Sequence, residues 1–239
     1  MNKRAMVLLS GGIDSTTCLH MAREEYGSDY VGALSVFYGQ RHQREAVCAE
    51  RTCRRLGIGF DIIDLSSIVP NTMLTDPNQD IPNKSYDDLD PGISPTYVPF
   101  RNGLMLSACA SYFFGKMKNL GFIDQKGNEG HALYFGAHAE DAENWAYADC
   151  TPEFIGAMAN AIYIGTYGSI RLHTPLEWMN KADVIRKGHQ LGVAWEDTWS
   201  CYKGGEVHCG VCPTCRSRRR GFVKAGVEDP TVYAAETFS

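Results

Sequence analysis

The chain has 239 residues, of which 44% are hydrophobic and 21% are charged, and this is enough to bury one sizeable core. Its formal net charge of -5 excludes a general attraction to nucleic acid, and its apolar runs fall short of the ~20 residues that a membrane span needs. We therefore expect a cytoplasmic protein with no stable nucleic-acid partner and no membrane contact.

Short apolar runs alternate with amphipathic helical patterns along most of the chain. This alternation indicates βαβ units and an α/β fold with a parallel sheet flanked by helices. Residues 66–99 interrupt the pattern with six prolines, and we expect a long loop near the active site there. The expected strands are 5–9, 30–38, 60–65, 132–138 and 170–176, and the expected helices are 14–25, 43–56, 101–118, 152–167 and 180–191.

The stretch "SGGIDS" (10–15) lies between the first strand and the first helix and has the features of an anion site. Gly11 and Gly12 let backbone amides approach an anion closely, and the first turn of a helix adds donors and a positive dipole end. The stretch lacks the lysine that a Walker A loop would have, and no Rossmann G-x-G-x-x-G motif follows an expected strand in this chain. We therefore expect a phosphate site of another kind.

In sequence and context, "SGGIDS" resembles the PP-loop of the ATP pyrophosphatases. The resemblance implies a Rossmann-like domain of the adenine nucleotide alpha-hydrolase (HUP) type, in which the loop grips the pyrophosphate end of ATP. An acceptor oxygen then attacks the α-phosphorus, and Asp14 is expected to act through Mg²⁺. The ATP-binding residues implied are Leu9, Ser10, Gly11, Gly12, Ile13, Asp14, Ser15, Thr16, Thr17, Cys18 and Leu19.

Four of the nine cysteines crowd into "CYKGGEVHCGVCPTC". The cluster and the odd total argue against a disulfide framework and for a metal site in a reducing compartment. Four thiolates suit a structural, tetrahedral Zn²⁺, one per chain, with His208 as a less favoured substitute ligand. The ligands expected are Cys201, Cys209, Cys212 and Cys215. We divide the chain into a PP-loop ATP-binding domain (1–194) and a zinc-binding extension packed on it (195–239).

A basic run, "RSRRR" (216–220), follows the cysteine cluster. It is typical of a solvated helix face, or it could act as an electrostatic lid near phosphate. A zinc module that binds nucleic acid is a third interpretation, which the acidic total charge and the lack of nearby aromatic platforms disfavour.

Further motifs narrow the resemblance to one family: "FYGQRH" (37–42), "PTYVPFRN" (95–102), "YADCTPEF" (147–154) and "TPLEWMNKAD" (174–183). Together with the zinc motif they resemble the 7-cyano-7-deazaguanine synthase family (QueC, preQ0 synthase) over nearly the whole chain. The resemblance implies an ATP-dependent ligase of queuosine and deazapurine biosynthesis. It would convert 7-carboxy-7-deazaguanine and ammonia to the nitrile through adenylated intermediates, as a homodimer with zinc and magnesium.

Candidate site residues lie in these motifs, mostly where strands end. Arginine matches carboxylate and phosphate geometry, whereas a carboxylate or amide could read a guanine-like edge and an aromatic ring could stack on it. The catalytic candidates are Arg41, Arg101, Asp149 and Lys181. The substrate-binding candidates are Tyr38, Gln40, Asn102, Asp141, Tyr147 and Glu153.

The chain departs from the family pattern at Phe100, where the common motif has glycine, and at Trp145. Bulk at these positions could reshape the pocket that selects the acceptor. The alternative within the ligase class is a relative that stops at the amide or joins deazaguanine to another amine. A tRNA-thiolating relative would need a reactive cysteine near the loop, and the helical position of Cys18 favours packing instead.

Overall fold

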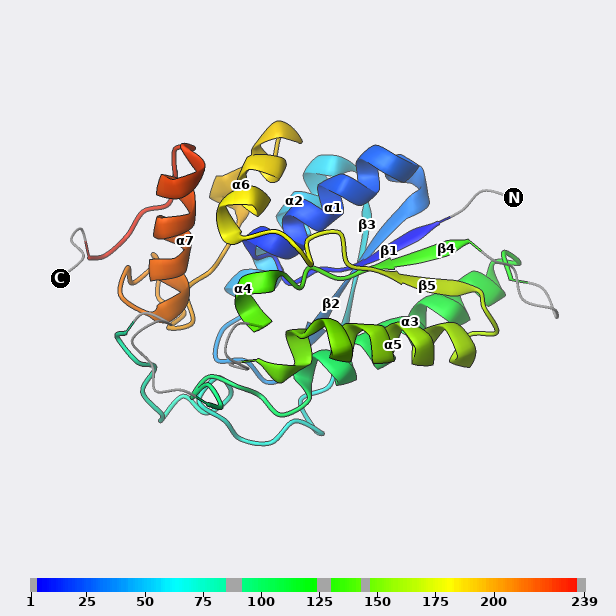
Figure 1. Cartoon of the computed structure of the whole chain (residues 1–239), viewed down its shortest axis with the longest axis horizontal. Helices are drawn as coiled ribbons and strands as arrows, with labels where there is room; N and C mark the ends of the chain where they lie inside the picture. The colour runs from blue at the N-terminus through cyan, green and yellow to red at the C-terminus, as the bar shows by residue number, and fades with distance from the viewer. Residues whose placement is uncertain (1–3, 85–91, 124–129, 143–146, 236–239) are drawn as a thin grey trace.

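The computed structural model describes residues 4–84, 92–123, 130–142 and 147–235. Five parallel strands form one sheet in the order β3-β2-β1-β4-β5 (Figure 1). This order confirms the expected α/β class, because it is that of a doubly wound sheet. The strands are β1 (Ala5–Leu8), β2 (Val31–Phe37), β3 (Gly59–Asp64), β4 (His131–Tyr134) and β5 (Ile170–His173).

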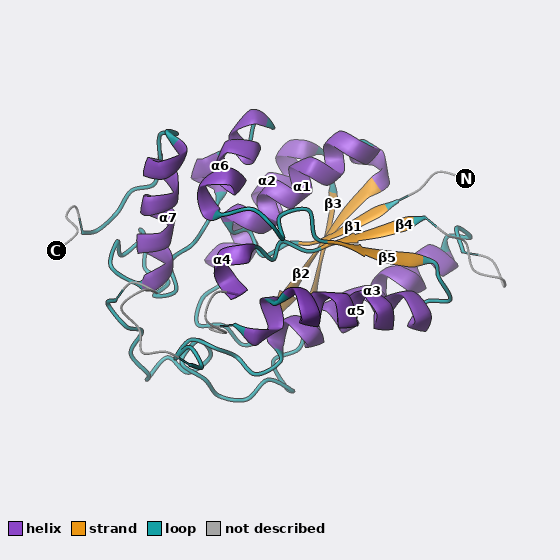
Figure 2. Cartoon of the chain, viewed as in Figure 1, coloured by secondary structure: helices purple, strands orange, loops and turns teal. Residues whose placement is uncertain are grey.

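Helices cover both faces of the sheet, with α1, α2 and α6 on one side and α3 and α5 on the other (Figure 2). Alternate residues of β1 supply the two cores: Val7 packs with α1 and α6, and Met6 packs with α3 and α5. The helices are α1 (Ile13–Tyr26), α2 (Arg44–Leu56), α3 (Arg101–Asn119), α4 (Ala139–Ala142), α5 (Pro152–Gly165), α6 (Lys181–Gln190) and α7 (Pro213–Ala225).

Local signals in the sequence explain where several helices begin and end. Thr151 caps α5 by accepting a hydrogen bond from Phe154 N (3.3 Å), and Pro152 occupies the first helical position. Asn180 and Asp183 form a reciprocal capping box at the start of α6. The helix α2 ends at Leu56 and is followed by Gly57, whose left-handed backbone (φ 66°) suits glycine.

The strand order reverses between β1 and β4, and ligands of doubly wound sheets bind at such a point. Val7 of β1 pairs with Ala33 of β2 on one side and with Tyr134 of β4 on the other. The fourth strand ends at Tyr134 instead of the expected residue 138, so residues 135–138 leave the sheet at its carboxyl edge. This exit directs them towards the loop that follows β1.

The described part of residues 66–99 contains no helix or strand, as expected for a loop. Leu74, Ile81 and Val98 bury their side chains in a third apolar cluster, together with Trp199 and the cysteines of the C-terminal segment. The loop therefore packs on the C-terminal part of the chain. Within the described residues, no helix is long and apolar enough to cross a membrane.

Candidate active site

A cavity of about 310 Å³ opens at the carboxyl ends of β1, β2 and β4. Its volume is in the range of small-molecule sites. The first two strands contribute the segments 8–10 and 35–38, and the exit from β4 contributes 135–137. Polar and charged side chains that line it include Ser10, Asp14, Ser15, Tyr38, Gln40, Glu45, Arg101, Asn102, Asp141, Tyr147, Lys181, Tyr202 and Arg218.

The loop after β1 takes the shape of an anion site. Gly11 has a φ of 91°, and a β-carbon there would lie 2.1 Å from the Glu45 carbonyl oxygen, so both strain and space require glycine. The Ser15 hydroxyl accepts a hydrogen bond from Ser10 N (3.1 Å) and fixes the loop. The first intrahelical bond of α1 runs from Thr16 N to Gly12 O (3.1 Å), so the amides of Ile13, Asp14 and Ser15 have no carbonyl acceptor within the helix.

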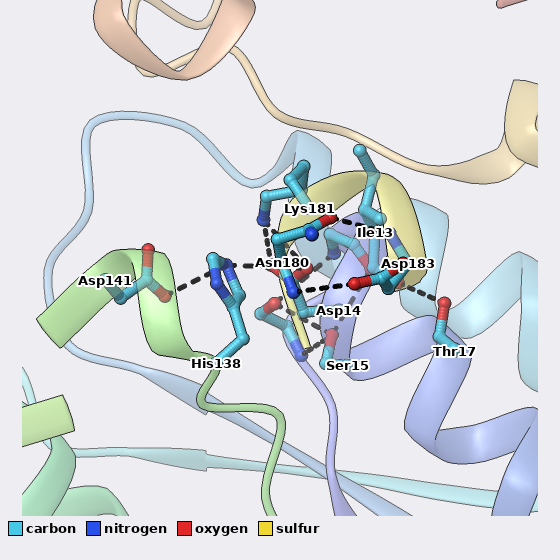
Figure 3. Close-up of polar contacts among 11 residues, drawn as sticks. Ile13, Asp14, Ser15, Thr17, His138, Asp141, Asn180, Lys181 and Asp183 are labelled. Atoms are coloured by element: carbon cyan, nitrogen blue, oxygen red, sulfur yellow. Dashed lines mark hydrogen bonds and ion pairs between the residues drawn. The ribbon is translucent and has the colours of Figure 1, made fainter. Parts of the chain in front are cut away.

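Asp14 is the centre of a polar network at the mouth of this loop (Figure 3). Lys181 Nζ lies 2.8 Å from both carboxylate oxygens of Asp14. His138 lies between the two aspartates, its Nε2 3.3 Å from Asp141 Oδ2 and 3.8 Å from Asp14 Oδ1. Burial raises the pKa of Asp14, but Lys181 and His138 outweigh it, so the pKa lies below its usual range. Asp14 is therefore a carboxylate at neutral pH.

Arg101, the first residue of α3, presents a half-buried guanidinium to the cavity, and the Nε atom itself is buried. Burial lowers its pKa, but Tyr38, Tyr202 and Asp149 more than compensate, so the pKa stays above its usual value. Its NH1 donates to the Tyr38 hydroxyl (3.4 Å), whereas its Nε has no acceptor among the described residues. No described carboxylate lies within ion-pair distance of Arg101, so this cation is suited to bind an anionic ligand.

Asn102 and Asp149 bind each other where α3 begins. Asp149 Oδ2 accepts a hydrogen bond from Asn102 N (2.9 Å), and Asn102 Nδ2 donates to Asp149 O (3.1 Å). Burial raises the pKa of Asp149, and the Asn102 hydrogen bond and Arg101 oppose that rise. Asn102 lines the cavity, whereas the Asp149 side chain lies behind it. Tyr147 also lines the cavity, and its hydroxyl is fixed by Thr96 Oγ1 at 2.6 Å.

Glu45 lies in the first turn of α2 and lines the same cavity. Its carboxylate has no hydrogen-bond or ion-pair partner among the described residues. Burial raises the pKa of Glu45 to about 7, and the attraction of Arg101 only partly opposes this. A carboxyl group with this pKa exists in both protonation states near neutral pH.

Several predicted site residues do not line the cavity. Arg41 donates to the backbone carbonyls of Pro77 (2.7 Å) and Gln79 in the long loop, and Glu153 is exposed on α5. Cys18 and Leu19 are buried in the core between α1 and the sheet, where burial also raises the pKa of the Cys18 thiol. The side chains of Thr16 and Thr17 are likewise buried. The cavity thus brings together Leu9, Ser10, Gly12, Ile13, Asp14, Ser15, Tyr38, Gln40, Arg101, Asn102, Asp141, Tyr147 and Lys181.

The chain departs from the family motif at Trp145 and Phe100, and the structure describes only the second of these residues. Trp145 lies outside the described residues. Phe100 takes a left-handed backbone (φ 54°) immediately before α3, and its ring lies 5.8 Å from that of Phe154. The Phe100 ring also covers Gly103, and Phe100 does not line the cavity.

The four clustered cysteines could hold a metal ion, because the sulfur atoms of Cys201, Cys209, Cys212 and Cys215 all lie within 4.8 Å of one another. Cys209 Sγ and Cys215 Sγ are 3.9 Å apart. Sulfur atoms ~2.3 Å from a tetrahedral zinc are ~3.8 Å from each other, so the spacing fits this ion. His208 is turned away from a ligand role: its Nε2 accepts from Ser200 N (3.1 Å) and its ring packs on Trp199 (4.1 Å).

The basic run lies in α7, but it is not a uniformly solvated face. Arg218 is only 1% exposed and donates to Thr198 Oγ1 (2.7 Å), Trp195 O (3.1 Å) and Asp229 Oδ1 (3.2 Å). Its donors are thus used inside the protein. The solvated-face interpretation was wrong for Arg218, because isolated sequence periodicity does not reveal the buried acceptors around it.

His138 and Glu45 are among the residues of the cavity region that the sequence analysis missed. Both follow strands at the carboxyl edge of the sheet, His138 after β4 and Glu45 after β2. Glu45 comes only three residues after the "YGQRH" motif, and His138 opens the polar stretch "HAED". Position after a strand was therefore the signal that could have found them.

Comparison with known proteins gives a consistent result. The family model described as "Queuosine biosynthesis protein QueC" matches residues 4–226. A 7-cyano-7-deazaguanine synthase of Caldicellulosiruptor bescii is 41% identical over 236 residues, which cover 98% of each chain. The synthase of Thermoplasma acidophilum is 40% identical, over 97% of this chain and 92% of the relative. The synthase of Cupriavidus taiwanensis is 41% identical, over 98% of this chain and 99% of the relative.

Proposed function

The chain belongs to the QueC family of queuosine biosynthesis proteins, and from this we propose that it is a 7-cyano-7-deazaguanine synthase. Such a ligase converts 7-carboxy-7-deazaguanine, ammonia and ATP to 7-cyano-7-deazaguanine through adenylated intermediates. We place the reaction in the cavity at the carboxyl edge of the sheet. The homodimer, the cytoplasmic location and the division at residues 194/195 belong to the same proposal.

The observation that carries the proposal is the guanidinium of Arg101, whose buried Nε has no acceptor among the described residues, in a cavity that also contains an anion loop. A buried Nε–H without an acceptor costs free energy unless a ligand binds it. A carboxylate is the anion that a planar guanidinium binds best, through two parallel hydrogen bonds. Arg101 would hold the substrate carboxylate while the loop at 10–15 holds the pyrophosphate part of ATP.

Adenylation explains why one cavity serves the whole conversion. A carboxylate is a poor electrophile, because its leaving group would be oxide, whereas AMP leaves readily from an acyl adenylate. Ammonia then gives an amide, and adenylation of the amide oxygen allows that oxygen to leave as well. The chain supplies positions and charge for both adenylations, and no covalent nucleophile is needed.

Two metal ions are part of the proposal. Zinc fits Cys201, Cys209, Cys212 and Cys215, which supply four soft ligands at tetrahedral spacing, and it would have a structural role. Magnesium fits the oxygen donors of Asp14, in the phosphate loop, and of Asp141, which lines the same cavity. When bound with ATP, magnesium supplies charge neutralisation at the phosphates.

Analysis of products tests this function directly. We expect 7-carboxy-7-deazaguanine, ATP and ammonium to give the nitrile together with AMP and pyrophosphate, measured by mass spectrometry and nucleotide chromatography. ADP and phosphate as the main nucleotide products would contradict attack on the α-phosphorus. An amide that never becomes a nitrile would favour the amide-forming alternative.

A further inference from the structure

The nitrogen atom must lose all of its protons during the proposed reaction. Ammonia is mostly ammonium near neutral pH, and a nitrile nitrogen carries no hydrogen. One proton leaves to make the nucleophile, one leaves after attack on the acyl adenylate, and two leave as the amide becomes the nitrile. A group that accepts protons at this nitrogen is therefore required, and general bases of this kind contribute ~10²–10⁴-fold to a rate.

Most carboxylates near the cavity are already engaged. Asp14 binds Lys181 through both oxygens, and Asp141 is paired with His138. Asp149 accepts the Asn102 amide and lies behind the cavity wall. Glu45 differs from all three, because it lines the cavity and has no hydrogen-bond or ion-pair partner among the described residues.

We propose that Glu45 is the proton acceptor for the nitrogen in this reaction, an inference that rests on the proposed synthase function. In the first half, the Glu45 carboxylate takes a proton from ammonium, and the ammonia formed attacks the acyl carbon. The nitrogen then loses its second proton to the phosphate of AMP as AMP leaves. In the second half, Glu45 takes a proton from the amide nitrogen as the amide oxygen bonds to the α-phosphorus and pyrophosphate leaves. It takes the last proton as the C–O bond breaks, the C≡N bond forms and AMP departs.

The position of Glu45 suits this role. It faces the cavity from the start of α2, while Arg101, the candidate for the substrate carboxylate, faces it from the start of α3. The backbone of Glu45 contacts the phosphate loop, since its carbonyl oxygen closely approaches Gly11. The proposed acceptor thus lies beside both the carboxylate site and the phosphate site.

The charge environment lets Glu45 release the proton again. With a pKa of about 7, raised by burial, the group binds a proton and returns it to solvent at similar cost. The titratable and charged groups that share its surroundings are Tyr38, Cys48, Arg101, Asp14, Asp141, Tyr147, Lys181, Tyr202 and Arg218.

The test compares Glu45→Gln with the wild type using two nucleophiles. With ammonium, we expect Glu45→Gln to slow amide and nitrile formation by at least ~100-fold. With hydroxylamine, which is unprotonated at neutral pH, we expect hydroxamate formation within about threefold of the wild type, because adenylation does not use Glu45. Equal losses of rate with ammonium and hydroxylamine, or no loss of rate with ammonium, would contradict Glu45 as the proton acceptor.

The pH profile and a matched control complete the test. We expect the wild-type rate with ammonium to rise through pH about 7, as Glu45 loses its proton. Glu45→Gln should lack this rise and recover only at alkaline pH, where free ammonia accumulates; an unchanged profile would contradict the proposal. Glu50→Gln is the control, because Glu50 lies on the same helix, exposed and paired with Arg54, and we expect wild-type rates. If the wild type with ammonium forms neither amide nor nitrile, the synthase function fails, independently of Glu45.

Discussion

Lys181 Nζ lies 2.8 Å from both carboxylate oxygens of Asp14, although 167 residues separate the two in the chain. The loop "SGGIDS" contains no lysine, yet the fold brings one to it from the first position of α6 (Figure 3). The capping box of Asn180 and Asp183 fixes the start of α6 and thereby the base of this side chain. The phosphate loop is therefore completed by tertiary structure.

The first prediction concerns this ion pair. We expect Lys181→Met to lower the free energy of unfolding by about 1.5–3 kcal/mol, because Asp14 loses a charged hydrogen-bond donor in a largely buried position. A double-mutant cycle with Asp14→Asn should show that the two losses are not additive. Lys187→Met is the control: Lys187 is 3.7 Å from the exposed Glu24, so its loss should cost about 0–1 kcal/mol. Additive effects at Lys181 and Asp14 would contradict the coupling.

The second prediction separates two roles for Arg101. If its guanidinium binds the substrate carboxylate, Arg101→Lys should raise the KM for 7-carboxy-7-deazaguanine about 10-fold or more and leave the KM for ATP near its original value. The reason is that lysine cannot form the paired hydrogen bonds of a guanidinium. Steady-state kinetics with each substrate varied in turn provides the measurement. An increase confined to the KM for ATP would assign Arg101 to phosphate, and Arg54→Lys, on the exposed face of α2, should change neither constant.

A third prediction addresses the cysteine cluster. Cys212→Ser should reduce the bound zinc, measured by elemental analysis, from one ion per chain to nearly none. The loss should also lower the melting temperature, because metal binding contributes to folding and the cluster lies in the apolar core shared with Trp199. Cys53→Ala is the comparison, since Cys53 is buried between α2 and the sheet and away from the cluster. A full zinc content in Cys212→Ser would remove Cys212 from the ligand set.

The order of the five strands and of the five helices α1, α2, α3, α5 and α6 could be predicted from periodicity, because each of these elements buries an apolar face, whereas α4 and α7 were not predicted. The expected helix at 101–118 is Arg101–Asn119 in the structure, and the expected strand at 5–9 is Ala5–Leu8. The phosphate loop was also predictable, since its glycines, serines and flanking elements are contiguous. Such features depend on residues close in sequence.

Contacts across the fold could not be predicted in this way. The pairing of Lys181 with Asp14 depends on how α6 is placed beside α1, and the burial of Arg218 depends on acceptors in the segment 195–200 and at Asp229. Arg41 matched a motif, yet its guanidinium binds carbonyls of the long loop. Motifs identify residue types, whereas the tertiary structure decides which side chains reach the cavity.

The last prediction concerns Phe100, whose φ of 54° is a conformation that suits glycine. A left-handed backbone costs a non-glycine residue about 1–3 kcal/mol in the folded state. Glycine avoids this cost, but its greater freedom in the unfolded chain lowers the free energy of unfolding by about 0.5–1 kcal/mol. We therefore expect Phe100→Gly to raise the free energy of unfolding by about 1 kcal/mol, measured by denaturant titration. Phe100→Ala is the matched variant, because it loses the ring contact with Phe154 but keeps the strained backbone, and it should be no more stable than the original chain.

The same variants test whether Phe100 influences the choice of acceptor. Its ring lies on Gly103 and Phe154 and does not line the cavity, so we expect the ratio of nitrile to amide to stay unchanged in Phe100→Gly. Mass spectrometry of the products at equal conversion gives this ratio. A shift of the ratio in both Phe100→Gly and Phe100→Ala would show that the ring acts on the cavity, whereas a shift in Phe100→Gly alone would point to the backbone at the start of α3. Because Arg101 follows immediately, such a backbone effect should also appear as a changed KM for the carboxylate substrate.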